Sequence, residues 1–489
     1  MKNSIIKNIS FKFLLEVLRI IIPIISVPYI YRIFKPEIMG KIEFSLSIVG
    51  YFFIFAGFGV YTYGLREISR VRNNKEQRNK LFTNLFLIST ASSIIVTLLY
   101  FGYVYFKFNS DLILKNMLLI NAINLISYIF YIEWINEAFE NYKFISQKTM
   151  IIKMINLICI FLFIKVSEDF YKYLFLINIF IFFNNFASFV YIRRYISFSF
   201  KNIEIKKYLF PLFLMILISN INVLYTQLDK IALGFYGKKI EEVAYYGVAQ
   251  KVMSIMMIII MSIVRVIMPR LSFYLGEGNK LEYENLLNKT FPYIYLLVFP
   301  ISIGTVILSG EIALFFGGVE YLVAKFAIIV FGIRLIVVTV ESILANQVIF
   351  LNQKEKVILY LYSGGGAINI LLKFCLIKYN ILSSGTSILT TMISEIILIF
   401  FEYKYIKKYL NFGLKIFNLR NLKYLIFSLS FFIIKYLLKD LQYHNLINSL
   451  IIFLYCSSSY FFILFITKDK CLSEIFKKIN IKQCLKGKI

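Results

Sequence analysis

Histidine is almost missing from this sequence, because only one of its 489 residues, His444, is a histidine. Histidine-centred acid–base catalysis and metal sites with several histidine ligands are therefore excluded. The five cysteines form no CxxC pair, so the sequence predicts neither a disulfide framework nor a zinc site. The sequence also lacks a G-x-x-x-x-G-K-[ST] phosphate loop. We expect no cofactor and no bound metal.

Charged residues are scarce as well, at 17% of the chain against about 25% in soluble domains. Hydrophobic residues make up 59%, and apolar runs of about 20 residues recur from end to end. Lysine and arginine outnumber acidic residues by 54 to 27, a net charge of +27. In so apolar a chain this excess is typical of cytoplasmic loops of membrane proteins rather than of nucleic-acid binding. The sequence predicts an integral membrane protein with no nucleic-acid partner.

Fourteen apolar segments are long enough to be transmembrane helices, and no alternating pattern indicates a barrel. They fall near residues 11–34, 42–63, 81–106, 112–135, 149–165, 171–192, 209–233, 245–268, 286–308, 322–350, 356–378, 381–403, 420–438 and 446–467. With a cytoplasmic N-terminus, the inner segments hold roughly 35 basic residues and the outer loops about 12. The positive-inside rule therefore predicts that both termini face the cytoplasm.

Several charged residues fall inside predicted helices, where a basic side chain costs about 2.5–3.5 kcal/mol to insert. Arg334 lies about twelve residues inside its helix, and Glu341, two turns further along, is a candidate partner. Glu395 is either a second partner for Arg334 or a coupling-proton site. Arg19 lies three residues after Glu16, close enough for an ion pair. Such charges either fix helix packing or line a water-filled cavity that receives an anion, and the sequence leaves both open.

Three local patterns point to one family. Residues 59–69 read G-V-Y-T-Y-G-L-R-E-I-S, residues 133–143 read E-W-I-N-E-A-F-E-N-Y-K, and residues 228–234 read L-D-K-I-A-L-G, with V-A-Y-Y-G at 243–247. Together with P-R-L-S at 269–272 and A-N-Q-V at 345–348, they resemble strings of the lipid-linked oligosaccharide flippases. These are the Wzx-type members of the polysaccharide-transport family, relatives of the MATE drug exporters. Residues 133 and 138 depart from the family pattern, with Glu for Asp and Ala for Gly.

The resemblance implies an all-α integral membrane protein of the bacterial cytoplasmic membrane. Residues 1–200 and 205–410 would form two six-helix lobes around a central cavity, followed at 411–489 by two extra helices and a basic cytoplasmic tail. It also implies the substrate, an undecaprenyl-pyrophosphate-linked oligosaccharide moved from the inner to the outer leaflet for O-antigen or capsule assembly. The expected partners are this glycolipid, membrane lipids and a polysaccharide polymerase complex.

The charged residues and the resemblance together give a set of candidate site residues. The predicted cavity cations for the pyrophosphate or acidic sugars are Arg19, Arg334, Lys230 and Arg66. The predicted coupling or ion-pair residues are Glu16, Glu341, Glu395 and Asp229. Arg66 and the Asp229-Lys230 pair lie at membrane boundaries, where a structural or topological role fits them at least as well.

Two other functions compete with the flippase. A MATE-like drug exporter would need acidic cavity residues for cationic drugs. The charged residues inside the predicted helices here are of both signs, with basic residues in excess. A membrane polysaccharide polymerase or glycosyltransferase would need a sizeable outer loop, and the predicted outer loops are short. We therefore expect a transporter rather than an enzyme.

Overall fold

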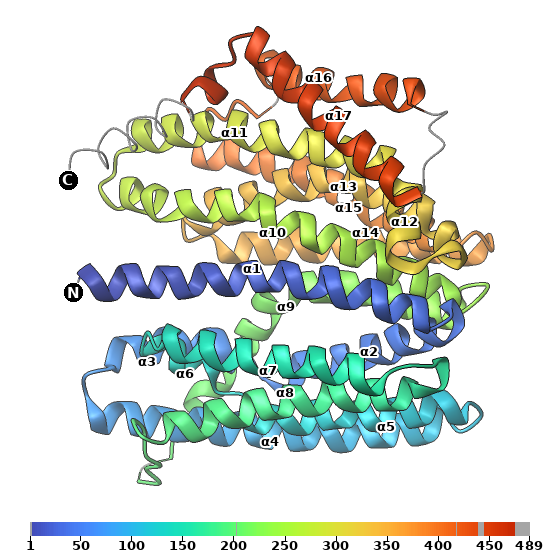
Figure 1. Cartoon of the computed structure of the whole chain (residues 1–489). Coiled ribbons are helices and arrows are strands. Elements are labelled where there is room, and N and C mark those ends of the chain that lie inside the picture. Colours follow the sequence, from blue (N-terminus) through green and yellow to red (C-terminus); the bar gives the residue numbers. More distant parts are fainter. Residues whose placement is uncertain (1, 202, 417, 439–444, 475–489) are drawn as a thin grey trace. The chain divides into compact units, whose positions relative to one another are not determined.

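The fold is that of a computed structural model of the chain. It describes residues 2–201, 203–416, 418–438 and 445–474; the side chains of 2–16, 217–226, 419–420 and 445–446 lie outside that description. Within these limits every regular element is a helix, from α1 (Lys2–Ile33) to α17 (Asn445–Ile466) (Figure 1). The predicted all-α membrane fold is confirmed.

The α-helices follow one another through short connections, as expected for a chain that repeatedly crosses a membrane. Between α1 and α17 they are α2 (Pro36–Ala56), α3 (Val60–Val71), α4 (Lys75–Lys107), α5 (Leu112–Ser127), α6 (Glu133–Ala138), α7 (Tyr142–Phe163), α8 (Phe170–Ile192), α9 (Ile205–Tyr236), α10 (Glu241–Gly276), α11 (Lys280–Ile307), α12 (Ser309–Gly317), α13 (Lys325–Ser342), α14 (Glu355–Lys378), α15 (Ser384–Tyr405) and α16 (Leu419–Leu437). Two π-helical segments, Ile343–Phe350 and Ile406–Leu410, continue α13 and α15.

Eleven helical stretches among the described residues are long and apolar enough to cross a membrane. The other three predicted segments coincide with α1, α9 and α16, each of which includes residues whose side chains are not described. All fourteen predicted segments are thus helical, while the count of fourteen membrane spans stays a prediction.

Two predicted segments are each broken into two helices. The segment expected at 42–63 divides where α2 ends at Ala56 and α3 begins at Val60. Phe58 and Gly59 have φ angles of +43° and +69°, and this left-handed backbone cannot continue a right-handed helix. The segment expected at 112–135 divides between α5 and α6 at a 3₁₀ turn, Tyr128–Phe130.

The chain forms two compact units. Unit 1 comprises residues up to Gly247 together with Lys373–Ser387, and unit 2 comprises Val248–Leu372 together with the residues from Ile388 onward. The lobes predicted at 1–200 and 205–410 remain a prediction, because the two compact units have other bounds and do not test them.

In unit 1, α2, α5 and α8 are linked by buried polar side chains. The Asn121 amide of α5 donates to Ser45 Oγ of α2 at 2.9 Å, and the Asn178 amide of α8 donates to Asn121 Oδ1 at 2.8 Å. All three residues are fully buried. Such bonds satisfy polar groups that have no access to water in a membrane, and they fix the rotation of each helix about its axis.

In unit 2, the two C-terminal helices pack against the preceding ones. α11 contacts both α13 and α16, and α16 contacts α17. The Tyr460 hydroxyl of α17 donates to the Leu296 carbonyl of α11 at 2.9 Å, and Lys435 of α16 lies 2.8 Å from Glu311 of α12. The helices at 411–489 are therefore attached to unit 2 by polar as well as apolar contacts.

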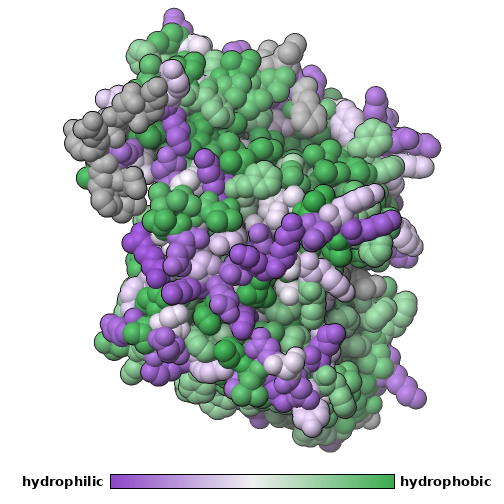
Figure 2. Space-filling view, turned by 90° about the vertical axis from the view of Figure 1, so that its right-hand side faces the viewer, coloured by the Kyte–Doolittle hydropathy of each residue, from purple (hydrophilic) through white to green (hydrophobic). Residues whose placement is uncertain are grey.

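Large apolar side chains are exposed along the membrane-spanning helices. Phe106 of α4 is 84% exposed and Phe465 of α17 is 73% exposed. Figure 2 shows hydrophobic residues covering much of the visible surface between groups of hydrophilic ones. Exposed apolar surface on this scale is typical of a protein surrounded by lipid.

Candidate functional site: buried ion pairs in the membrane-spanning helices

The first buried ion pair joins three helices of unit 1. Glu43 of α2 is 2% exposed, and the Lys230 ammonium of α9 lies 2.5 Å from its Oε2. The Tyr31 hydroxyl of α1 donates to Glu43 Oε1 at 3.0 Å. The Glu43 carboxylate therefore receives both a charged and a neutral donor.

A second pair lies at the neighbouring residue of α9. Asp229 is fully buried, and the Lys373 ammonium of α14 lies 2.5 Å from its Oδ1. The Tyr246 hydroxyl of α10 donates to Asp229 Oδ2 at 2.7 Å. Two consecutive residues of α9 thus form two parallel arrangements, each with a carboxylate, an ammonium group and a tyrosine.

These two pairs form what we call the neutral cluster: Glu43, Asp229, Lys230 and Lys373. Its two carboxylates and two ammonium groups cancel, as burial in a membrane requires. Removing one partner of a buried ion pair typically costs about 3–5 kcal/mol, so the cluster fixes how these helices pack. Lys230 was predicted as a cavity cation and Asp229 as a coupling or ion-pair residue, with a structural role allowed for both; each forms an ion pair in this structure. A contact of Lys230 with substrate stays a prediction.

Two of the sequence strings that resemble the flippase family, 228–234 and 243–247, lie at the neutral cluster. They supply glycines where helices approach closely. A Cβ atom added at Gly247 would lie 3.0 Å from the Tyr31 hydroxyl and 3.1 Å from Glu43 Cγ. One added at Gly234 would lie 2.1 Å from the ring of Phe44. Gly247 therefore leaves room for the contact between Tyr31 and Glu43, and Gly234 leaves room for the ring of Phe44.

The strings at 59–69 and 133–143 also encode packing contacts. A Cβ atom at Gly64 of α3 would lie 2.6 Å from the ring of Trp134 of α6, which is 1% exposed. Beside Trp134, Glu133 pairs with the buried Lys148 of α7 at 2.9 Å. Lys148 also donates to Ser188 Oγ of α8 at 2.6 Å. These strings join α3, α6, α7 and α8 into one packed group in unit 1.

Unit 2 holds another buried ion pair. Arg334 of α13 is 5% exposed and meets Glu395 of α15 in a bidentate arrangement, with Nε 2.8 Å from Oε2 and Nη2 2.5 Å from Oε1. The guanidinium carbon lies 5.5 Å from the ring centre of Phe331. Of the two partners predicted for Arg334, Glu395 forms this pair. Two parallel hydrogen bonds make such a contact strong and directional.

Glu341, the other partner predicted for Arg334, also contacts a residue that was not predicted. It lies on α13, is 5% exposed, and accepts a hydrogen bond from the Tyr362 hydroxyl of α14. Its carboxylate interacts electrostatically with Arg334, but the bidentate contact of Arg334 goes across to Glu395. A neighbouring carboxylate, Glu402 of α15, is fully buried as well.

The remaining predicted residues lie elsewhere. Arg19 of α1 is exposed, and the side chain of Glu16 lies outside the described residues, so the predicted pair between them is not described. Arg66 of α3 is exposed and pairs with its neighbour Glu67 at 2.8 Å. The roles predicted for Arg19 and Arg66 stay predictions.

Sequence reasoning did not find Glu43 and Glu402. Glu43 is the second residue of the predicted segment 42–63, and Glu402 is the second-last residue of the predicted segment 381–403, so in the sequence each resembles a residue at a membrane boundary. The partners of Glu43 could not have been assigned, because Tyr31 and Lys230 lie on other helices.

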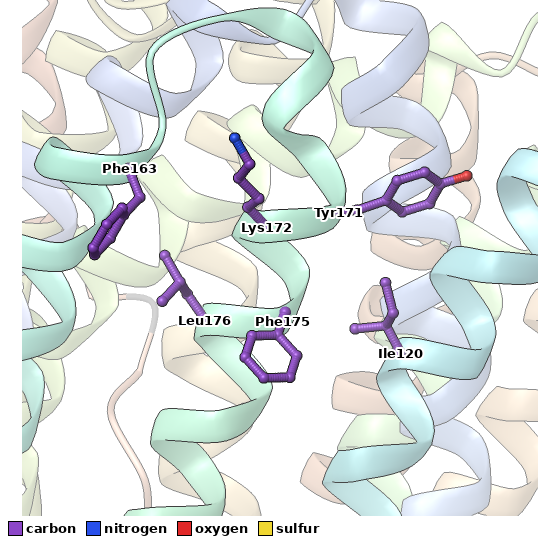
Figure 3. Close-up of a pocket in the computed structure, with 6 residues that line it drawn as sticks. All are labelled: Ile120, Phe163, Tyr171, Lys172, Phe175 and Leu176. Atoms are coloured by element: carbon purple, nitrogen blue, oxygen red, sulfur yellow. The ribbon is translucent and has the colours of Figure 1, made fainter.

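Two cavities are lined mainly by apolar side chains. The larger, about 570 Å³, lies in unit 2 among α10, α11, α12, α16 and α17, where Leu296, Pro300, Phe431, Phe453 and Tyr460 are among its lining residues. The smaller, about 420 Å³, lies in unit 1 (Figure 3). Its lining residues are Ile120, Phe163, Tyr171, Lys172, Phe175 and Leu176. None of the predicted site residues lines either cavity.

Comparison with known proteins identifies the family of the chain. Residues 5–274, more than half of it, match the family described as "Polysaccharide biosynthesis protein". The chain belongs to this family. The family predicted from the sequence strings is thereby confirmed.

One curated relative of this chain is a "Putative O-antigen transporter" of Shigella dysenteriae. The two are 24% identical over 408 residues, which cover 82% of this chain and 100% of the relative.

Solved structures show the same fold. The lipid II flippase MurJ in an inward closed conformation aligns with a TM-score of 0.71 at 17% identity, covering 94% of this chain and 100% of MurJ. An inward-facing multidrug resistance MATE transporter of the MOP superfamily aligns with a TM-score of 0.64 at 12% identity, covering 83% and 99%. The chain therefore has the same fold as these two solved structures.

Proposed function

We propose that this protein is a flippase that moves an undecaprenyl-pyrophosphate-linked oligosaccharide from the inner to the outer leaflet for O-antigen or capsule assembly. The observation that carries the proposal is the family match over residues 5–274, combined with a relative named as an O-antigen transporter that is covered along its whole length. The protein acts on its substrate by moving it, without a covalent step.

The physical need for such a protein follows from the substrate. A sugar hydroxyl that enters hydrocarbon without a hydrogen-bond partner costs several kcal/mol, roughly 2–7 by different measures. An oligosaccharide carries many hydroxyl groups, so its head cannot cross the membrane unaided. A polar path between helices would replace the lost hydrogen bonds while the lipid chain stays among apolar groups.

The apolar cavity of unit 2 supports a lipid-linked substrate. Its walls combine aliphatic and aromatic side chains from α11, α16 and α17, among them Leu297, Ile301 and Phe461. A polyprenyl chain has no hydrogen-bonding groups and gains free energy wherever it covers such surface. We assign this cavity to the polyprenyl chain of the substrate.

Among the predicted cavity cations, the role of Arg334 can be tested most directly. Because Arg334 is paired with Glu395, an anionic head group would have to take the place of that carboxylate. We propose that Arg334 exchanges Glu395 for the pyrophosphate during transport, and that exposed Arg19 provides an earlier contact. The Arg334→Ala variant should then lose export at unchanged protein level.

A double variant separates this role from a purely structural one. If Arg334 only fixes packing, Arg334→Ala/Glu395→Ala removes both charges and should restore export. If Arg334 binds substrate, the double variant stays inactive although it folds. Restored export in the double variant would rule out the anion role of Arg334.

We further propose a multi-pass protein of the bacterial cytoplasmic membrane with both termini in the cytoplasm. Cysteine-accessibility labelling of Glu277→Cys and Lys238→Cys, on predicted inner and outer loops, tests this orientation. In that orientation an inside-negative potential favours outward movement of an anion by about 2.3 kcal/mol per charge per 100 mV. Labelling of Glu277→Cys from outside intact cells would contradict the topology.

Transport itself can be measured in vesicles. Purified protein is reconstituted into liposomes whose inner leaflet carries a radiolabelled undecaprenyl-pyrophosphate oligosaccharide, and a lectin outside captures what reaches the outer leaflet. We expect capture to require the protein. Uptake of a cationic dye such as ethidium, measured in the same vesicles, tests the drug exporter; dye transport without glycolipid transport would refute the flippase.

A further inference from the structure

Unit 1 holds another cavity, and polar side chains take part in lining it. It has a volume of about 180 Å³ and lies along α7 and α8, two helices that contact each other (Figure 1). Thr149, Lys153 and Asn156 of α7 and Asn184 of α8 are among its lining residues. We call it the polar cavity.

The polar cavity lies well inside two membrane-spanning stretches. Its described lining residues occupy positions i, i+3, i+4 and i+7 of residues 149–156 in α7 and of residues 177–184 in α8, which is the spacing of one helix face. Lys153 is eleven residues from the beginning of α7 and ten from its end, about 15–17 Å from either at 1.5 Å per residue. Both helices are long and apolar enough to cross a membrane. Polar residues at this depth are costly, and they commonly mark a substrate path.

The side-chain oxygens of Asn156 and Asn184 are acceptors without a donor. Each oxygen is shielded from solvent, and neither has a hydrogen-bond partner within the part of the chain that the structure describes. Buried polar groups in native proteins are nearly always hydrogen-bonded, because an unpaired one costs its full hydration. Two such oxygens on the residues that line one cavity indicate an occupant that donates hydrogen bonds.

The chemistry of the lining residues selects the class of occupant. A phosphate group presents acceptor oxygens and would leave both asparagine oxygens unpaired. A metal ion or a cationic drug would find no carboxylate or thiolate on the described lining residues. A sugar ring carries hydroxyl groups, each of which donates one hydrogen bond and also accepts. It can donate to Asn156 and Asn184 and accept from the Lys153 ammonium and the Thr149 hydroxyl.

The size and the remaining walls of the polar cavity also suit a sugar. A volume of 180 Å³ equals about six waters at roughly 30 Å³ each, which is room for one sugar ring and not for a whole oligosaccharide. Phe180 and three isoleucines complete the described lining and can cover the carbon face of the ring. Lys153 already has an interaction in the protein, but its ammonium group has three donor hydrogens and can serve a ligand as well.

We propose that Thr149, Lys153, Asn156 and Asn184 form a subsite that binds one sugar residue of the glycan. This rests on the proposed function, because it gives the glycan head a polar contact inside the membrane. The sugar displaces water from the polar cavity, and its hydroxyl or acetamido groups donate to the two asparagine oxygens. The subsite therefore selects glycans by the positions of these groups on the bound sugar.

Saturation-transfer nuclear magnetic resonance tests the subsite without any transport. The full-length protein is placed in lipid nanodiscs free of sugar-based detergent, and glucose, N-acetylglucosamine, rhamnose and galacturonate are added one at a time. We expect the wild type to bind at least one of them. Asn156→Leu and, independently, Asn184→Leu should each weaken this binding about fivefold, the usual worth of one hydrogen bond.

A third asparagine provides a matched control. Asn124 of α5 lies in the same unit and also has a buried side-chain oxygen without a described partner, but it is not one of the described residues that line the polar cavity. Asn124→Leu should leave sugar binding unchanged. Leucine is close to asparagine in size and removes an unpaired polar group, so all three variants should unfold at or above the wild-type temperature. Weaker sugar binding at undiminished stability is a result that a purely structural role would not give.

Four results would overturn the proposal. They are no binding of any of the four sugars to the wild type, unchanged binding in both cavity variants, and an equal loss of binding in Asn124→Leu. The fourth is displacement of the bound sugar by inorganic pyrophosphate, which would show an anion site in place of a sugar site.

The role of the subsite in transport is tested separately in the liposome assay. At subsaturating glycolipid, Asn156→Leu/Asn184→Leu should slow flipping at least about fivefold, and Asn124→Leu should not slow it. Wild-type vesicles without any flipping would refute the proposed function and leave the sugar-binding result intact. Flipping by the double variant at the wild-type rate would refute the part of the subsite in transport.

Discussion

Replacing Lys373 by Met should destabilise unit 1 by a predictable amount. The change removes the ammonium group 2.5 Å from Asp229 and leaves a fully buried carboxylate that still accepts a hydrogen bond from the Tyr246 hydroxyl. Removing one partner of a buried ion pair costs about 3–5 kcal/mol. Protonation sets a ceiling, because adding a proton to an ordinary aspartate at neutral pH costs about 4 kcal/mol. We expect a loss of about 3–4 kcal/mol.

The assay is equilibrium unfolding of the detergent-solubilised protein for wild type, Lys373→Met, Asp229→Asn and the double variant. The double variant should recover most of the loss, since it buries no charge. Lys378→Met, the same change at an exposed lysine of the same helix, should have little effect. The reasoning fails if Lys373→Met is as stable as wild type, or if the double variant is no more stable than the single one.

Two further predictions concern packing and pH. Gly64→Ala places a Cβ atom 2.6 Å from the Trp134 ring and should cost about 1–3 kcal/mol in the same unfolding assay, whereas Gly102→Ala, which meets no atom within 4 Å, should cost nothing. Equal stability of these two variants would contradict the close approach. The hydrogen bond from Lys80 lowers the pKa of the Glu204 carboxyl, so their ion pair holds at neutral pH and is lost as pH falls through that lowered pKa. In a nuclear magnetic resonance titration, Lys80→Met should move the Glu204 pKa upward, and an unchanged titration would count against this contact.

The fold could be predicted because its signals are local along the chain. Apolar runs of membrane length predicted fourteen segments, and each of them coincides with helix in the structure, since each helix must satisfy its backbone hydrogen bonds internally in lipid. The breaks within two of the predicted segments were harder to predict from the sequence. The break after Ala56 depends on the left-handed backbone at Phe58 and Gly59, and a hydropathy average does not register a change of backbone angle.

The family was also accessible from the sequence, and the structure explains why its strings are informative. Gly64 leaves the space that the ring of Trp134 occupies, and Gly247 leaves room for Tyr31 and Glu43. These residues are restricted in size by direct contact, so the pattern is visible in the sequence although its cause is three-dimensional.

Local patterns along the chain were therefore enough to show that it is helical, lies in a membrane and carries charges inside its helices. How those charges pair depends on the packing of the helices against one another. Reasoning along one helix placed Glu341 near Arg334, but the bidentate partner, Glu395, lies 61 residues away on α15. Which side chains meet across helices depends on how each helix is rotated and packed. That is set by the whole of the core, and no spacing within a single segment contains it.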